Sequence, residues 1–404
     1  MKKYLTRTIW ILSFVSLFTD TASEMLYPIM PIYLKSIGFS VVLIGILEGI
    51  AEATAGLSKG YFGKLSDKTG KRAPFVQLGY ALSSISKPMM AIFIYPLWIF
   101  FARTLDRLGK GIRTGARDAM LSDEATSKTK GKVFGFHRSM DTFGAVIGPS
   151  LALLYLYFYP EDYQTLFYIA FLPGVASILF SFFLKDKKNA NTETKKRTSF
   201  FSFLHYWKES PNIYRKVVFG LLVFTLFNSS DMFLLLKVKE TGLSDAAVVG
   251  VYIFYNLIYA LFSFPIGIIA DNLGLKNIFI FGLALFSLVY FGMSITSNFY
   301  IYFGLFFFYG LYAAATEGIS KAWISNITEK KDTATAIGTY AAFQSICTML
   351  ASSITGILWF NFGFEVAFIT IAVVTLAVII YFVFVIPAPS DGITTILTEQ
   401  NNAD

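Results

Sequence analysis

The chain has 404 residues, of which 55% are hydrophobic, 18% aromatic and only 15% charged, and its mean hydropathy is +0.59. This composition excludes an ordinary soluble domain, in which about 25% of the residues are charged, and assigns the chain to a lipid bilayer. A single cysteine and two histidines exclude a disulfide framework and a clustered metal site, so we expect neither a metal nor a cofactor.

Twelve apolar segments are each long enough to cross the bilayer as a helix, which takes roughly 20 residues. We therefore predict an all-α membrane protein with 12 transmembrane helices in two pseudo-symmetric six-helix bundles. The predicted spans are 9–34, 42–63, 74–94, 96–118, 132–158, 163–184, 214–237, 246–270, 276–296, 298–322, 333–359 and 364–386.

Lysine and arginine gather at the N-terminus and in the even-numbered loops, whereas the loops near Pro160 and Gly363 carry acidic residues. Because short cytoplasmic loops collect basic residues, we expect a multi-pass protein of the cytoplasmic membrane with both termini in the cytoplasm. The same asymmetry accounts for the net charge of +8, so no nucleic-acid partner is needed to explain that charge.

The first two predicted helices each carry two acidic residues four positions apart, Asp20 with Glu24 and Glu48 with Glu52. Residues at this spacing share one face of a helix, so each pair forms an acidic stripe. At a rise of about 1.5 Å per residue, Asp20 and Glu52 reach the middle of the bilayer. An ionised group is costly there unless it faces a cavity or a partner, which makes these carboxylates candidate functional groups.

The loop after the second helix reads Gly63-x-Leu-x-Asp67-Lys-x-Gly70-Lys-Arg72. Its glycines permit a tight turn and close helix contact, and its carboxylate can cap the N-terminus of a facing helix. The loop resembles the motif G-x-L-x-D-[RK]-x-G-[RK]-[RK] of the major facilitator superfamily and matches it at every defined position. The resemblance implies a gate loop whose aspartate faces the eleventh helix, which opens near Thr333.

A related loop returns 204 positions later, with Gly267 and Asp271 at the places of positions 63 and 67. The same offset joins Arg117 to Lys321. A shared offset in an apolar chain indicates two homologous halves, as in transporters that rock around a central site. We expect Asp271 to meet the start of the fifth helix near Gly131, so that the two loops form paired latches.

The fourth helix contains Arg103-Thr-Leu-Asp106-Arg107-Leu-Gly109, which resembles the superfamily motif R-x-x-Q-G-x-G. Asp106 and Arg107 depart from the motif, so either Arg103 or Arg107 is the functional arginine. Carboxylates gathered around Arg103 would form a proton relay, because Arg103 stays charged and biases its neighbours. The predicted relay and cavity residues are Asp20, Glu24, Glu48, Glu52, Arg103, Asp106 and Asp141, of which Asp20, Glu24 and Arg103 are the favoured cavity residues. The alternative is a static salt-bridge network that only fixes helix packing.

The fifth helix places Gly135, Gly144, Gly148 and Pro149 at a spacing that resembles the motif G-x8-G-x3-G-P of the drug/proton antiporter branch. Small residues on one face let helices approach closely, and the proline adds a kink. The glycine pair that ends the branch motif is missing. The resemblance favours export over import, and generic tight packing is the alternative.

The second half is expected to be neutral at the depth of the acidic stripes, because the residue 204 positions after Glu24 is Asn228. Amide and aromatic side chains would then hold the substrate there. The predicted substrate-binding residues are Asn228, Tyr255, Asn256 and Gln344. Nearer the cytoplasm, we expect ion pairs of an inner gate to include Arg113, Glu317 and Lys321.

Three regions are predicted along the chain: an N-terminal bundle over 1–187, a cytoplasmic linker over 188–213, and a C-terminal bundle with a polar tail over 214–404. The basic part of the linker, 185–197, is expected to be solvated. The aromatic part, 198–207, either lies on the membrane surface or packs as a short helix beneath the bundle.

These features predict a monomeric major facilitator transporter that exports a small molecule in exchange for protons by alternating access. Proton-linked uptake on the same fold is the second hypothesis. An integral membrane enzyme is disfavoured because the chain contains no HExxH or GxSxG motif. A receptor or scaffold would not need a duplicated gate loop.

Overall fold

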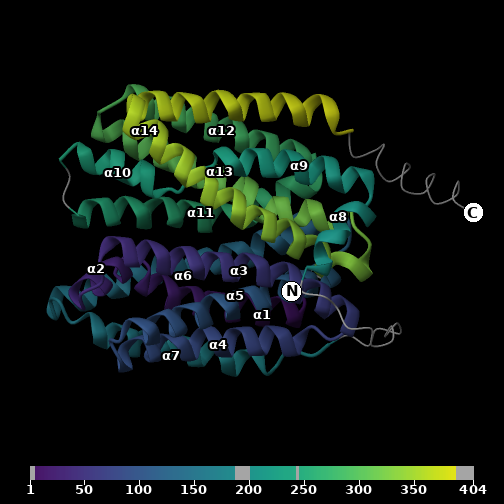
Figure 1. Ribbon diagram of the computed structural model, residues 1–404. Helices are drawn as coiled ribbons and strands as arrows, with labels where there is room; N and C mark the ends of the chain where they lie inside the picture. The colour runs from purple at the N-terminus through teal and green to yellow at the C-terminus, as the bar shows by residue number, and fades with distance from the viewer. Residues whose placement is uncertain (1–4, 187–200, 243–244, 388–404) are drawn as a thin grey trace, which may run out of the picture.

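The computed structural model describes residues 5–186, 201–242 and 245–387, and this part of the chain is helical with no strand. The helices lie in two layers, with α1 to α7 in one and α9 to α14 in the other (Figure 1). The predicted all-α fold with six passages in each half is confirmed. The basic part of the linker, predicted over 185–197, lies almost wholly outside the described residues.

The first half consists of seven helices, because its first passage is split in two. They are α1 (Arg7–Leu26), α2 (Met30–Ser36), α3 (Val41–Thr69), α4 (Ala73–Ile92), α5 (Pro96–Glu124), α6 (Lys130–Phe158) and α7 (Tyr163–Ser181). A short connection follows, formed by η1 (Ser202–His205) and α8 (Tyr206–Glu209).

The second half repeats this arrangement. Its helices are α9 (Asn212–Phe227), α10 (Met232–Glu240), α11 (Asp245–Leu273), α12 (Leu275–Ile295), α13 (Phe299–Asn326), η2 (Lys330–Asp332) and α14 (Thr333–Val385). Two passages meet inside α14 at Gly363, whose backbone is not helical (φ 86°).

The sequence offset of 204 is reproduced in the backbone. Helix α3 spans 41–69 and α11 spans 245–273, so both ends of the second helix of each half are displaced by the same number. Two glycines with a left-handed backbone conformation are also 204 positions apart, with φ of 92° at Gly38 and 89° at Gly242. Glycine is favoured at these turns because a Cβ is strained at positive φ. The two halves are therefore structural repeats.

The first passage of each half is broken, whereas the sequence predicted continuous helices over 9–34 and 214–237. In the first half the break lies between α1 and α2, where two prolines lack the N–H that a helix interior needs. In the second half it separates α9 from α10 at Asn228–Asp231, where the Ser230 hydroxyl accepts a hydrogen bond from the backbone of Met232 at 3.3 Å. Short polar side chains compete in this way with helical hydrogen bonds.

Seven helical ranges of the described chain are long and apolar enough to cross a membrane. They are Arg7–Leu26, Lys130–Phe158, Tyr163–Ser181, Asn212–Glu240, Ala247–Leu273, Leu275–Ile295 and Lys330–Val385. Helices α3 and α5 are equally long but carry several charged residues, which are described below. Large exposed apolar side chains such as Leu97, Leu172 and Phe384 give the bundle a surface suited to lipid.

Glycines bring the two halves into backbone contact. A Cβ on Gly135 of α6 would lie 2.5 Å from the Ser263 carbonyl oxygen of α11, and a Cβ on Gly63 of α3 would lie 2.4 Å from the Ala334 carbonyl oxygen of α14. Gly144 and Gly148 instead allow α6 to contact α1, next to Asp20 and Thr21 in the case of Gly144. Because glycine has no side chain, the helix backbones can approach this closely and still pack against each other.

The described residues of the aromatic part of the linker, 201–207, pack beneath the bundle, as in one of the two alternatives left open by the sequence. Phe203 is 1% exposed. Its ring lies over Gly60 of α3, and its carbonyl oxygen accepts a hydrogen bond from the Thr339 hydroxyl of α14 at 3.4 Å. Trp207 packs on Phe343 with ring centroids 5.9 Å apart. The connection therefore contacts both halves.

Candidate functional site

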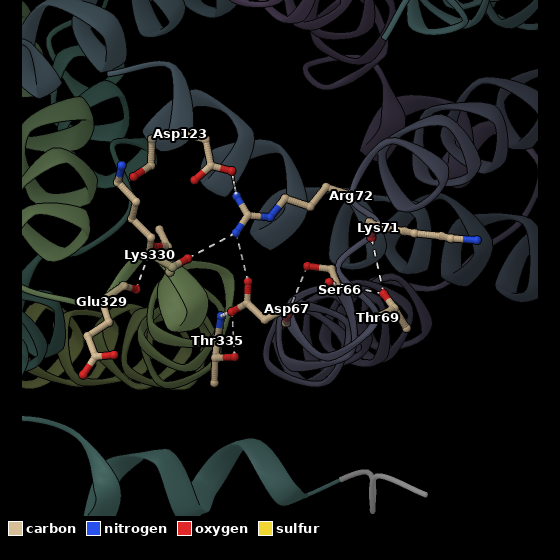
Figure 2. A network of polar contacts seen from close by, with 12 residues as sticks. Ser66, Asp67, Thr69, Lys71, Arg72, Asp123, Glu329, Lys330 and Thr335 are labelled. Atoms are coloured by element: carbon tan, nitrogen blue, oxygen red, sulfur yellow. Dashed lines mark hydrogen bonds and ion pairs between the residues drawn. The ribbon is translucent and has the colours of Figure 1, made fainter. Parts of the chain in front are cut away.

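One end of the bundle holds the basic loops around Lys68, Lys71, Arg72 and Lys330, and we call it the basic end. Here Asp67 accepts hydrogen bonds from the Thr335 backbone N–H at 2.7 Å and from its hydroxyl at 2.8 Å, in the first turn of α14. Arg72 donates to Asp67 at 3.2 Å and pairs with Asp123 (Figure 2). The structure thus places Asp67 against the helix that the sequence indicated.

The second half provides the matching contact. Asp271, at the end of α11, accepts hydrogen bonds from the backbone N–H groups of Gly131 at 2.7 Å and Lys132 at 2.9 Å. These groups belong to the first turn of α6, where a helix has unpaired N–H groups and a partial positive charge. Each half therefore caps a helix of the other half with an aspartate.

A third contact between the halves involves residues related by the 204 offset. Asp118 of α5 is 1% exposed, accepts a hydrogen bond from Arg117 Nε at 2.9 Å and forms an ion pair with Arg117 Nη2 at 2.9 Å. Lys321 of α13 forms an ion pair with the same carboxylate at 2.9 Å. The position of Lys321 agrees with the expected inner gate.

Arg113 was expected to take part in this gate, and the structure places it elsewhere. Its guanidinium lies over the ring of Tyr80 at 4.6 Å and donates to the Ser83 hydroxyl at 2.5 Å. Both partners belong to α4, so the contacts of Arg113 remain inside the first half.

A cavity of about 310 Å³ lies between the two halves. Asp20 and Glu24 of α1 line it from the first half, and Asp231, the residue before α10, lines it from the second half. All four residues predicted to hold substrate also line it, namely Asn228, Tyr255, Asn256 and Gln344. The cavity combines carboxylates with aromatic and amide groups, the few polar groups in a concave site that orient a small ligand.

Arg138 of α6 connects the halves at this cavity. It forms an ion pair with Asp141 at 2.9 Å, approaches Glu317 of α13 at 4.0 Å and donates to the Tyr259 hydroxyl of α11. Asp141 also accepts a hydrogen bond from the Ser16 hydroxyl of α1. Glu317, expected to form part of the inner gate, lines the central cavity instead.

Comparison with known proteins identifies the family. The family model of the Major Facilitator Superfamily matches residues 12–258 and 232–400. An uncharacterized MFS-type transporter of Methanocaldococcus jannaschii is 32% identical over 361 residues, which cover 88% of this chain and 89% of the relative. The chain belongs to the Major Facilitator Superfamily.

Two further proteins are similar to this member of the superfamily. The quinolone resistance protein NorA of Staphylococcus aureus is 24% identical over 166 residues, which cover 41% of this chain and 42% of NorA. The crystal structure of the human organic anion transporter MFSD10 has a TM-score of 0.76 with 16% identity, and the match covers 93% of this chain and 99% of that chain. This structural likeness establishes a shared transporter fold.

The structure does not place Arg103 among the residues that line the cavity, so the predicted cluster of carboxylates around this arginine is wrong as a description of the central site. Arg103 donates to both oxygens of Glu48, at 2.8 and 2.9 Å, and lies 3.4 Å from Asp106. Arg107 pairs with Glu52 at 3.1 Å. These residues form an ion-pair network between α3 and α5, within the first half.

The expected neutrality of the second half is also wrong. Asp231 and Glu317 both line the cavity, and the Tyr255 hydroxyl donates to Asp231. Asp231 could have been found from the sequence, because it stands alone as an acid inside the predicted span 214–237. Comparing residues 204 positions apart did not reveal Asp231, because the corresponding residue of the first half is Tyr27.

Proposed function

We propose that the chain is a proton-coupled exporter of a small molecule that works by alternating access. The proposal depends on one observation, the cavity between the halves that Asp20, Glu24 and Arg138 line, with Asp141 paired to Arg138 behind them. Carboxylates at membrane depth are the groups that proton-coupled transporters use to exchange protons for substrate. The transport site is then this cavity.

Orientation follows from the distribution of basic residues. Cytoplasmic loops collect lysine and arginine, so the basic end faces the cytoplasm and the protein is a multi-pass component of the cytoplasmic membrane. The aspartate caps and the ion pair of Asp118 with Lys321 join the halves at that end. The described conformation is therefore closed at the end that we assign to the cytoplasm.

Proton coupling is assigned to Asp20 and Asp141. No hydrogen bond or ion pair joins Asp20 to another described residue, whereas Asp141 is held by Arg138 and Ser16. Asp20 of α1 and Asp141 of α6 belong to helices that touch where Gly144 meets Asp20, so a change in the charge of one carboxylate acts on the other. Asp20, which lacks a partner, is the group that takes up and releases the proton, and substrate binding displaces it.

Arg138 couples this exchange to movement of the halves. When Asp141 is ionised, Arg138 has carboxylate partners on both sides of the interface, in Asp141 and Glu317. A change in the charge near Asp141 changes how strongly Arg138 binds the second half. The aspartate caps at the basic end would then open as the halves rock.

The experiment uses everted membrane vesicles with an acidified interior and an entrapped fluorescent pH probe. Panels of organic cations, zwitterions and anions are added outside, at the proposed cytoplasmic face. An exporter releases protons from the interior when a substrate is present, and Asp20→Asn abolishes this release while Glu365→Gln, in an exposed position, retains it. Movement of protons into the vesicles together with the added substrate would favour the uptake hypothesis, and no proton movement in either orientation would exclude proton coupling.

A further inference from the structure

Two carboxylates from different halves share one wall of the cavity. The Tyr252 hydroxyl donates to Glu24 at 2.8 Å, and the Tyr255 hydroxyl donates to Asp231. The rings of Tyr252 and Tyr255 meet edge to face with centroids 5.4 Å apart. Glu24, Tyr252, Tyr255 and Asp231 therefore form a continuous surface, which we call the acidic wall.

The acidic wall lacks a cationic partner. Among the described residues, Glu24 and Asp231 form hydrogen bonds only with hydroxyl and backbone groups, and no ion pair reaches either of them. Lys110 of α5 acts on Glu24 electrostatically but forms no ion pair with it, and its charge also acts on Glu52. Carboxylates at membrane depth are costly without a counter-charge, so the cavity favours a ligand that supplies one.

The arginines near the cavity are already neutralised. Arg138 is engaged by Asp141 and Glu317, and Arg103 and Arg107 are engaged by carboxylates of α3. An anionic ligand that used one of these arginines would have to displace its carboxylate partner, and the ligand would face the acidic wall as well. The charge arrangement thus discriminates against anions.

Aromatic faces complete the site. Tyr309 lines the cavity beside Tyr255, with ring centroids 5.3 Å apart, and Tyr312 lies 5.3 Å further on. Tyr309 is 6% exposed, and its hydroxyl has no hydrogen-bond partner among the described residues. Aromatic faces attract organic cations, by about 2 kcal/mol or more where the cation is desolvated.

We infer that the acidic wall is a binding site for an organic cation, which inserts between Glu24 and Asp231 and stacks on the tyrosines. The inference rests on the proposed function, since it takes the cavity to be the transport site. The cavity volume of about 310 Å³ lies at the lower end of the usual range for small-molecule sites. The substrate class is then a monovalent organic cation, an ammonium or phosphonium centre that carries aromatic or alkyl groups, in a fold that an organic anion transporter shares.

The test compares two ions of the same shape and opposite charge, tetraphenylphosphonium and tetraphenylborate. Equilibrium dialysis with the purified full chain in detergent measures binding of each ion. We expect saturable binding of the phosphonium and no saturable binding of the borate. Asp231→Asn and Glu24→Gln should each weaken phosphonium binding at least tenfold, whereas Glu365→Gln leaves it unchanged.

Asp231→Glu keeps the charge and provides a second measurement if the asparagine variant does not fold. It should bind the phosphonium more tightly than a Tyr309→Ala variant, which removes an aromatic face. Equal binding of both ions, or phosphonium binding unaffected by Asp231→Asn and Glu24→Gln, would overturn the inference.

Binding in detergent requires no pH gradient, so the result is independent of proton coupling. Phosphonium binding without proton release from vesicles would leave the cation site in place and refute the proposed exchange. Proton release driven only by anions would support the exchange and refute the cation site.

Discussion

Asp67 binds the first turn of α14 through both the backbone and the side chain of Thr335. An Asp67→Asn variant can still accept a hydrogen bond, but it loses the charge that complements the helix N-terminus, worth about 0.3–1 kcal/mol, and the pair with Arg72. We expect a larger population open at the basic end. Distances between spin labels at positions 71 and 329, in a Cys347→Ser background, measure this population.

Asp162 offers a matched control for that variant. It also caps a helix, accepting from the Thr165 backbone N–H at 3.3 Å, but both residues belong to α7 and its preceding turn, inside the first half. Asp162→Asn should leave the label distances unchanged. Equal effects of the two variants would show that Asp67 acts only on local helix stability.

Arg103 and Glu48 test the boundary between the cavity and the ion-pair network. Their bidentate contact predicts a coupling free energy of at least about 1 kcal/mol in a double-mutant cycle with Arg103→Met and Glu48→Gln, measured by thermal unfolding. Phosphonium binding should survive in the folded Arg103→Met protein, because Arg103 does not line the cavity. Loss of binding with unchanged stability would place Arg103 in the site.

Residue depth could be predicted from the sequence, but the direction in which each side chain points could not. Asp20 and Glu52 both reach the middle of the bilayer by helix rise, yet Asp20 faces the cavity and Glu52 pairs with Arg107 of α5. Helix rotation depends on packing against neighbours, which composition and spacing do not report. The motif around Asp67 was more informative, because a capping carboxylate requires a specific partner, the first turn of a helix.

At the scale of the helices, α11 contains two glycines with contrasting surroundings. A Cβ on Gly267 would lie 2.3 Å from the Gly131 carbonyl oxygen of α6, whereas a Cβ on Gly250 would meet nothing within 4 Å. Gly267→Ala should therefore hinder closure at the basic end and lower transport. Gly250→Ala should preserve transport and leave stability unchanged or slightly higher, since alanine favours a helix by about 1 kcal/mol. Cysteine labelling of the basic end in each variant reports its accessibility.

The short connection formed by η1 and α8 predicts a second effect at this scale. The ring of Phe203 is buried against Gly60 of α3, while the backbone carbonyl of the same residue holds Thr339 of α14, so the ring anchors a connection that contacts both halves. Phe203→Ala should cost about 3–5 kcal/mol, the usual range for loss of a buried phenylalanine. Denaturation in detergent measures this loss. A Phe201→Ala change, at a 54% exposed position, should have little effect.

Helix boundaries were predictable where polar loops and the repeat defined them, as for α3 and α11. The breaks between α1 and α2 and between α9 and α10 were not predicted. Hydropathy averages over about 20 residues, so a break of three or four residues inside an apolar segment is lost. The Asn-Ser-Ser-Asp run at 228–231 carried the signal, because these residues bind the backbone in non-helical ways.

For the whole molecule, the repeat predicted two layered halves, and the aspartate caps follow that symmetry closely. Function depends on the departures from symmetry. The cavity receives Glu24 from the first half and Asp231 from the second, and these are not equivalent positions. The comparison of residues 204 positions apart therefore predicted the two halves and their loops, but it did not predict which side chains meet in the cavity between the halves.

Asp118 is placed so that Arg117 and its repeat-related counterpart Lys321 both depend on one carboxylate. If that negative charge is removed, Arg117 of the first half and Lys321 of the second half face each other without a carboxylate between them. The electrostatic interaction between the halves at this contact then changes from attraction to repulsion. Asp118→Asn should therefore separate the two halves at the basic end, and spin labels at positions 71 and 329 should lie farther apart than in the native protein. The charge of one side chain would thus determine whether the two repeats attract or repel each other at this contact.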